Sequence, residues 1–180
     1  MSDYSKTEER FNINSHKLGF ILSILGLGLL VDKGQGAYDL KSQISFIVFG
    51  VSMVMLYLAS TLYHSSVDLT ERHRRKILDH SAIYILISGS YSPYMLAGLG
   101  DRLGWIVFVT VWIFALVGIT LKVFFTGRFK LVSTLMYVFM GWMIVFFITP
   151  LRKVVSEECF QWLLFGGVSY TFGALIYMFK

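Results

Sequence analysis

The 180-residue sequence is poor in charge and in proline, and it contains a single cysteine. Asp, Glu, Lys and Arg make up 15% of the chain, against about 25% in an ordinary soluble domain. Because only two prolines are present, long stretches are free to form uninterrupted helices. The lone Cys159 excludes an internal disulfide framework and a cysteine-rich zinc site.

Apolar residues take the place of the missing charge. They make up 56% of the chain, aromatic residues make up 17%, and the mean hydropathy is +0.65. A soluble globule of this size cannot bury so much apolar surface, so the composition excludes a cytosolic enzyme, a nucleic-acid-binding module and a disordered chain. The net charge of +5 does not change this conclusion, because most basic residues flank apolar runs. We therefore expect an integral membrane protein.

Repeated apolar runs approach or reach the roughly 20 residues that a helix needs to cross a bilayer. The expected spans are 17–31, 43–63, 77–98, 103–125, 131–150 and 159–179. The first run is the shortest, but its leader has mixed charge and no small-residue cleavage site follows, so we expect a retained helix rather than a signal peptide. Backbone groups in lipid must be paired internally, which favours helices over strands. The sequence predicts an all-α, polytopic helix bundle that forms one domain over residues 1–180.

The distribution of Lys and Arg predicts a cytoplasmic N-terminus. Eleven of the sixteen basic residues then lie on the cytoplasmic side, as the positive-inside rule requires. The basic run at 72–76, between the second and third spans, contributes most. We interpret this run as a topology signal that contacts lipid headgroups, and we expect no nucleic-acid partner. The predicted location is the plasma membrane.

Candidate functional residues gather where the second span ends and the third begins. Ser60 and His64 are four residues apart and share one helix face, and Asp79 opens the next, antiparallel span. A neutral imidazole is a common zinc ligand, and a nearby carboxylate can deprotonate a water molecule. The alternative is that His64 and Asp79 are interfacial residues at helix ends, with Asp79 favoured by the positive N-terminal dipole. The spacing alone leaves both interpretations open.

Two further histidines lie near this cluster. His16 opens the first span at the level of His64, where it can join the cluster or act as an interfacial anchor. His80 is adjacent to Asp79 and therefore points elsewhere, so we interpret it as a partner in helix–helix hydrogen bonding. His73 lies among arginines and is expected to be solvated.

Small residues and Pro93 mark places where helices bend or approach one another. Pro93 is expected to bend the third span, where the serine-rich run 88–92 either lines a cavity or packs tightly against a neighbour. Glycines at 26–28 are expected to give the first span a close-approach face. A second such face is expected on the sixth span, around residues 166–173.

At these positions the chain resembles the hemolysin III family, the bacterial branch of the progestin and adipoQ receptors. The resemblance covers essentially the whole chain. Its markers are Glu8-Glu9 with Asn12, Ser15, His16 and Gly19; Ser60 with Tyr63 and His64; and the run 78–84, continuing into 89–93.

The resemblance implies seven helices, a cytoplasmic N-terminus and a zinc site near the cytoplasmic face. Residue by residue, it makes His64 a metal ligand and assigns Asp79 and Ser60 to the catalytic machinery. The other two zinc ligands of the family come from a His-x-x-x-His motif on the last helix, and this sequence has no histidine after His80. Two of the three expected ligands are thus absent, and we expect the bundle to lack the seventh helix through truncation rather than loss of the metal.

Three functions follow as hypotheses. The first is a zinc-dependent membrane hydrolase of a small lipid substrate, an amide or an ester, with membrane lipids as the surroundings. The second is a pore-forming, cytolytic protein, as the family name implies, although no polar stripe is available to line a wide channel. The third is a non-enzymatic, receptor-like protein of lipid homeostasis. The sequence names neither the substrate nor the oligomeric state.

Overall fold

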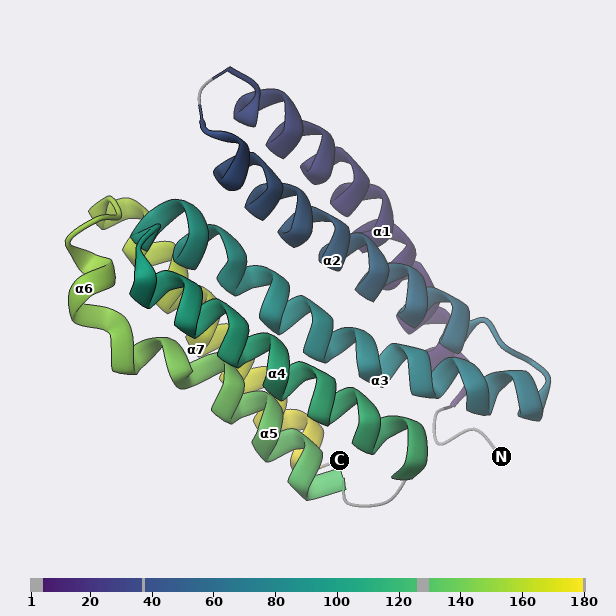
Figure 1. Ribbon diagram of the computed structural model, residues 1–180. Coiled ribbons are helices and arrows are strands. Elements are labelled where there is room, and N and C mark those ends of the chain that lie inside the picture. The colour runs from purple at the N-terminus through teal and green to yellow at the C-terminus, as the bar shows by residue number, and fades with distance from the viewer. Residues whose placement is uncertain (1–4, 37, 126–129, 180) are drawn as a thin grey trace.

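The computed structural model describes residues 5–36, 38–125 and 130–179, and these residues form helices joined by short loops, without a strand (Figure 1). Among the described residues, six helical segments are long and apolar enough to cross a membrane, which confirms the predicted all-α polytopic class. The elements are α1 (Lys6–Gly34), α2 (Leu40–His64), α3 (Leu69–Ser92), η1 (Pro93–Leu99), α4 (Arg102–Phe125), α5 (Lys130–Trp142), η2 (Met143–Phe147), α6 (Ile148–Arg152) and α7 (Glu157–Phe179).

The first and third spans begin earlier than the apolar runs predict. Ser5 caps α1 through a capping box, in which its hydroxyl accepts from the Glu8 N–H and the Glu8 carboxylate accepts from the Ser5 N–H. Asp68 caps α3 in a similar way, accepting from the Glu71 N–H at 2.8 Å. Such caps satisfy the free N–H groups of a helix start and stabilise polar turns that hydropathy does not detect. The expected starts at 17 and 77 were therefore wrong by about two to three turns.

Helix α3 lies at the centre of the bundle. It packs against α2 on one side and against α4 and α5 on the other, whereas α1 packs along α2 and α7 along α5 (Figure 1). Half of the most apolar stretch of this span is buried, against 6% for those of α1 and α7. Side chains of α3 and its neighbours form the core, which includes Tyr84, Ile87, Tyr91, Met95, Val107, Val111, Ala115, Tyr137 and Met140.

At Pro93 the third span does not simply bend but changes from an α-helix to the wider π-helix. From Pro93 to Leu99 the helix continues as the π-helical segment η1, and the Gly100 N–H closes it by donating to the Met95 carbonyl, five residues back, at 3.0 Å. Gly100 adopts φ +64°, a left-handed conformation that glycine reaches without strain. Upstream, Ser88 donates to the Val111 carbonyl of α4 at 3.2 Å, so this run packs tightly against its neighbour.

The fifth span is broken, and a tyrosine from α3 satisfies the break. Helix α5 ends at Trp142, and the 3₁₀ segment η2 connects it to α6. The buried Tyr91 hydroxyl donates to the Met140 carbonyl at 2.7 Å and accepts from the Ile144 N–H at 2.8 Å. A broken helix at membrane depth requires such partners, because lipid offers none.

The stretch 26–28 approaches α2 closely at Leu27, whose Cα would lie 3.2 Å from a Cβ on Gly50, but the predicted face of α7 has no such neighbour among the described residues. Among the described residues, a Cβ on Gly28 would meet no atom within 4 Å, and the same holds for Gly166, Gly167 and Gly173 of α7. The close contact between α1 and α2 is made by Gly19, where a Cβ would overlap the Tyr57 ring, and by Gly50. Small residues predict close packing only where a neighbouring helix faces them, and the sequence pattern does not show which face that is.

Candidate functional site

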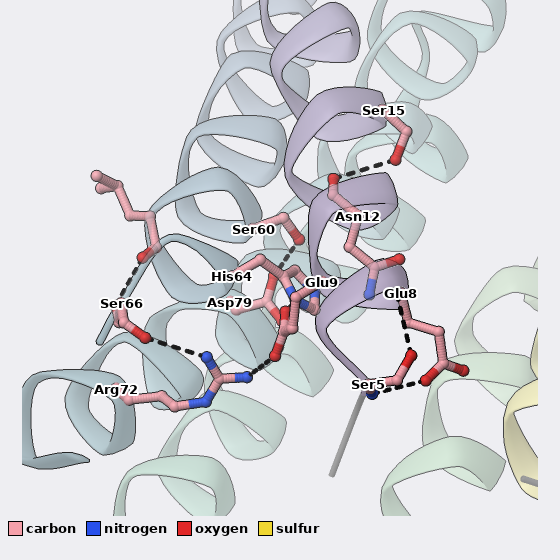
Figure 2. Close-up of polar contacts among 11 residues, drawn as sticks. Ser5, Glu8, Glu9, Asn12, Ser15, Ser60, His64, Ser66, Arg72 and Asp79 are labelled. Atoms are coloured by element: carbon pink, nitrogen blue, oxygen red, sulfur yellow. Dashed lines mark hydrogen bonds and ion pairs between the residues drawn. The ribbon is translucent and has the colours of Figure 1, made fainter. Parts of the chain in front are cut away.

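The candidate site lies at the end of the bundle where α1 starts, α2 ends and α3 starts. Figure 2 shows polar side chains from these three helices pointing toward one another, with Ser60, His64, Asp79 and Glu9 close together at the centre of the view. Because α1, α2 and α3 run in alternating directions, the start of α1, the end of α2 and the start of α3 lie at the same end of the bundle. The antiparallel arrangement expected for Ser60, His64 and Asp79 is thus what the structure shows.

A buried hydroxyl and a buried carboxylate form the inner part of the site. The Ser60 hydroxyl of α2 donates a hydrogen bond to Oδ1 of Asp79 on α3. The two residues are 7% and 8% exposed, respectively. A carboxylate taken out of water is costly unless it is hydrogen-bonded, so this contact favours the buried position of Asp79. Asp79 is therefore more than a surface cap at the start of a helix.

His64 faces a carboxylate that belongs to the first helix. Its Nδ1 lies 2.7 Å from Oε2 of Glu9, and the side chains of His64 and Glu9 are 8% and 14% exposed. Sequence reasoning placed Glu8-Glu9 among the family markers but assigned no role to Glu9. A signal was available, because Glu9 and His16 are seven residues apart and share one helix face.

Arg72 is a second residue whose position the sequence did not reveal. The guanidinium pairs with Oε1 of Glu9, donates to the Ser66 carbonyl at 3.2 Å and lies 4.8 Å from the centre of the Tyr63 ring. The interpretation of the run 72–76 as a set of headgroup contacts was therefore incomplete for Arg72. His73, the next residue, is exposed as expected.

Of the other two histidines, His16 takes the first of its two expected roles, whereas the ring of His80 is not the hydrogen-bonding partner that we expected. His16 stacks on His64 with ring centroids 5.5 Å apart and planes inclined by 8°, so it joins the cluster. His80 lies on a different face of α3, where its carbonyl accepts from the Tyr137 hydroxyl at 2.9 Å. Its Nδ1 is buried and has no hydrogen-bond partner among the described residues.

Among the described residues, His64 is suited to supply one ligand of a zinc site. Within the ranges that the structure describes, no group of three His, Cys, Asp or Glu side chains is placed to hold a metal ion. His64 nevertheless has the environment of a metal-binding histidine, because such residues commonly bind a carboxylate through the nitrogen that does not face the metal. Zinc in a catalytic site takes three protein ligands, so His64 can be one of them.

These features define a class of protein: a polytopic helical membrane protein with a buried hydroxyl–carboxylate pair and a carboxylate-bound histidine at one end of its bundle. The chain belongs to the haemolysin-III-related family, whose model matches residues 4–180. This match confirms the resemblance deduced from the motifs.

Individual relatives agree with this assignment. The chain is 41% identical over 173 residues to the Hemolysin-3 homolog of Bacillus subtilis (strain 168), covering 96% of this chain and 81% of the relative. It is also 41% identical to Hemolysin-3 of Bacillus cereus, of which 79% is covered. The human monocyte to macrophage differentiation factor is 23% identical over 179 residues, with 94% of this chain and 71% of the relative covered. No solved structure matches the chain.

Proposed function

We propose that this protein is a zinc-dependent hydrolase of a lipid amide or ester, acting at the membrane face where α1 starts. The observation that carries the proposal is the buried Ser60–Asp79 pair one helical turn from His64, whose Nδ1 is bound by Glu9. Metal-dependent hydrolases use a histidine as a metal ligand and a nearby carboxylate as a general base.

In this proposal His64 would hold the metal as one of its protein ligands. Zinc bound there would supply a Lewis acid that polarises a carbonyl group and lowers the pKa of a water molecule to about 7. Asp79 accepts the proton of the attacking water, the water oxygen bonds to the carbonyl carbon, and the C–N or C–O bond breaks. Asp79 then returns the proton to the leaving nitrogen or oxygen. Ser60 keeps the carboxylate of Asp79 in place through its hydrogen bond.

We further propose that this face is cytoplasmic and that the membrane is the plasma membrane. The excess of Lys and Arg on the side of the N-terminus supports the orientation. A lipid substrate suits the location, because large apolar side chains such as Leu62 and Leu78 are exposed near the site on α2 and α3. Such a surface allows an acyl chain to remain in the bilayer while the polar linkage reaches the site.

The test is made on the full-length protein purified in detergent. We expect about one zinc per chain and turnover of at least one member of a panel of lipid amides and esters. Chelation should abolish turnover, and zinc should restore it. Protein that is folded and zinc-loaded but turns over none of the panel would contradict the hydrolase, and protein that binds no zinc would contradict the metal site.

A further inference from the structure

We infer that Glu9 is a positioning residue that fixes the tautomer of His64 and so leaves Nε2 as the ring nitrogen available to a metal. This inference rests on the proposed function, because it assigns Nε2 as the metal-binding atom. Both carboxylate oxygens of Glu9 are engaged. Oε1 binds the guanidinium of Arg72, and Oε2 lies 2.7 Å from Nδ1 of His64.

The chemistry of these partners determines where the proton lies. Arginine remains protonated in proteins, so the pairing with Arg72 favours the ionised form of Glu9. An ionised carboxylate only accepts hydrogen bonds, and the atom facing Oε2 must therefore donate. Nδ1 of His64 therefore carries a hydrogen, and Nε2 is the ring nitrogen that Glu9 leaves free.

The surroundings keep Glu9 in this position. Arg72 is held by the Ser66 carbonyl and lies against the Tyr63 ring, so the guanidinium is fixed by the end of α2. His16, one side of which stacks on His64, restricts rotation of the imidazole. Three helices thus determine the geometry of one carboxylate–imidazole contact (Figure 2).

A carboxylate in this role contributes to metal affinity without touching the metal. Loss of such a partner typically lowers metal affinity or activity by about 10–100-fold. The same carboxylate also connects α1 to α2 and α3, so a stability measurement alone cannot distinguish positioning from a structural contact. The tautomer of His64 distinguishes the two.

The decisive variant is Glu9→Gln. The amide has the shape of the carboxylate, but Arg72 requires an acceptor, so the amide oxygen should face Arg72 and the NH₂ group should face His64. Nδ1 then becomes an acceptor, and the proton moves to Nε2, which cannot bind a metal in that form. Glu9→Gln should therefore invert the tautomer while preserving the packing.

The experiment measures ¹⁵N chemical shifts of histidine-labelled, metal-free full-length protein at neutral pH. The signals of His64 are assigned by their loss in His64→Gln. We expect a protonated Nδ1 and an unprotonated Nε2 in the wild type, and the reverse in Glu9→Gln. Zinc affinity, measured by competition with a chelator, should fall by about 10–100-fold in the same variant.

Two control variants accompany the measurement. Glu8→Gln changes the adjacent residue, where glutamine still completes a capping box, and should alter neither the tautomer nor zinc affinity. Arg72→Lys keeps a cation beside Glu9 and should preserve the wild-type tautomer.

Unchanged shifts in Glu9→Gln, or a doubly protonated ring in the wild type, would overturn the inference and reduce the contact to an ion pair. A wild type that binds zinc, with Glu9→Gln binding it equally well, would likewise remove only the role of Glu9. Absence of zinc from the wild type would instead contradict the proposed function.

Discussion

Ser60 and Asp79 share a hydrogen bond across the interface between α2 and α3, although 19 residues separate them in the chain. The bond forms because the short connection between the helices places the end of α2 beside the start of α3. It keeps one carboxylate oxygen occupied inside the protein. The proposed reaction requires the other oxygen to receive a proton.

Asp79→Asn should separate metal binding from turnover. The amide keeps the size of the carboxylate and can still accept from Ser60, but it cannot take a proton from water. We expect most bound zinc to remain at saturating metal and turnover of the lipid substrate to be lost. Zinc content and turnover of the same preparation provide the measurement, and unchanged turnover would return Asp79 to a structural role.

Ser60→Ala should have a milder effect than Asp79→Asn. The serine acts by holding the carboxylate, and a water molecule can replace its hydroxyl. We expect turnover to fall by less than in Asp79→Asn, with zinc content unchanged. Ser15→Ala is a suitable control, because Ser15 is exposed and, among the described residues, donates to the Asn12 carbonyl within α1. A loss in Ser60→Ala as complete as that in Asp79→Asn would make the hydroxyl essential.

The proposed orientation predicts the behaviour of topology reporters. A reporter fused after Glu71, near the start of α3, should be cytoplasmic, and one fused near Asp101, before α4, should be external. The positive-inside rule gives this result because the run 72–76 lies at the first position. The opposite pattern would place the candidate site at the external face.

The six spans were predictable because the bilayer imposes their length and composition on the sequence. The meeting of Ser60 with Asp79 was predictable for a related reason, since consecutive antiparallel helices bring residues at matching depths together. Glu9 was not assigned a role, because the apolar run predicted that the first helix begins near residue 17. Only the capping box at Ser5 extends the helix far enough to bring Glu9 beside His64.

Contacts that depend on side-chain direction were also missed. Arg72 was grouped with its basic neighbours, although it turns inward while His73 turns outward. Tyr91 was only one member of a serine-rich run, and its hydroxyl satisfies a helix break some 50 residues away. Such contacts require the rotation of each helix about its axis, which neither hydropathy nor residue spacing specifies.

Tyr91→Phe should destabilise the break in the fifth span. The substitution leaves the Ile144 N–H and the Met140 carbonyl without the hydroxyl between them. An unsatisfied buried polar group costs about 1–3 kcal/mol, and lipid provides no replacement partner. The measurement is thermal unfolding in detergent. Tyr38→Phe, at an exposed position before α2, is the matched control and should unfold like the wild type.

Gly104→Ala should be far more disruptive than Gly28→Ala. A Cβ on Gly104 would overlap the carbonyl oxygen of Met95, which belongs to the backbone of η1 and cannot move aside as a side chain would. A Cβ on Gly28 meets no described atom within 4 Å, and alanine is the better helix former. We expect a lower unfolding temperature or a loss of folded yield only for Gly104→Ala. Equal stability of the two variants would contradict the packing of α4 against η1.

The last prediction concerns His64 itself. His64→Ala should abolish bound zinc, because it removes the ligand that α2 contributes and leaves fewer than the three that a catalytic zinc site requires. The fold should survive the change, since the carboxylate of Glu9 keeps its ion pair with Arg72 and that of Asp79 keeps its hydrogen bond from Ser60. His16 cannot replace the lost ligand, because its ring is stacked alongside the His64 ring, 5.5 Å away, and not in its place.

The matched control for His64→Ala is His73→Ala, at an exposed position of α3. Both variants should elute like the wild type and show a cooperative unfolding transition. Only His64→Ala should lack zinc in metal analysis of the full-length chain. Because protein folding is measured in the same samples, a loss of metal cannot be attributed to unfolding. Full zinc occupancy in folded His64→Ala would contradict the ligand assignment, and the carboxylate bound to Nδ1 would then be a structural contact between α1 and α2.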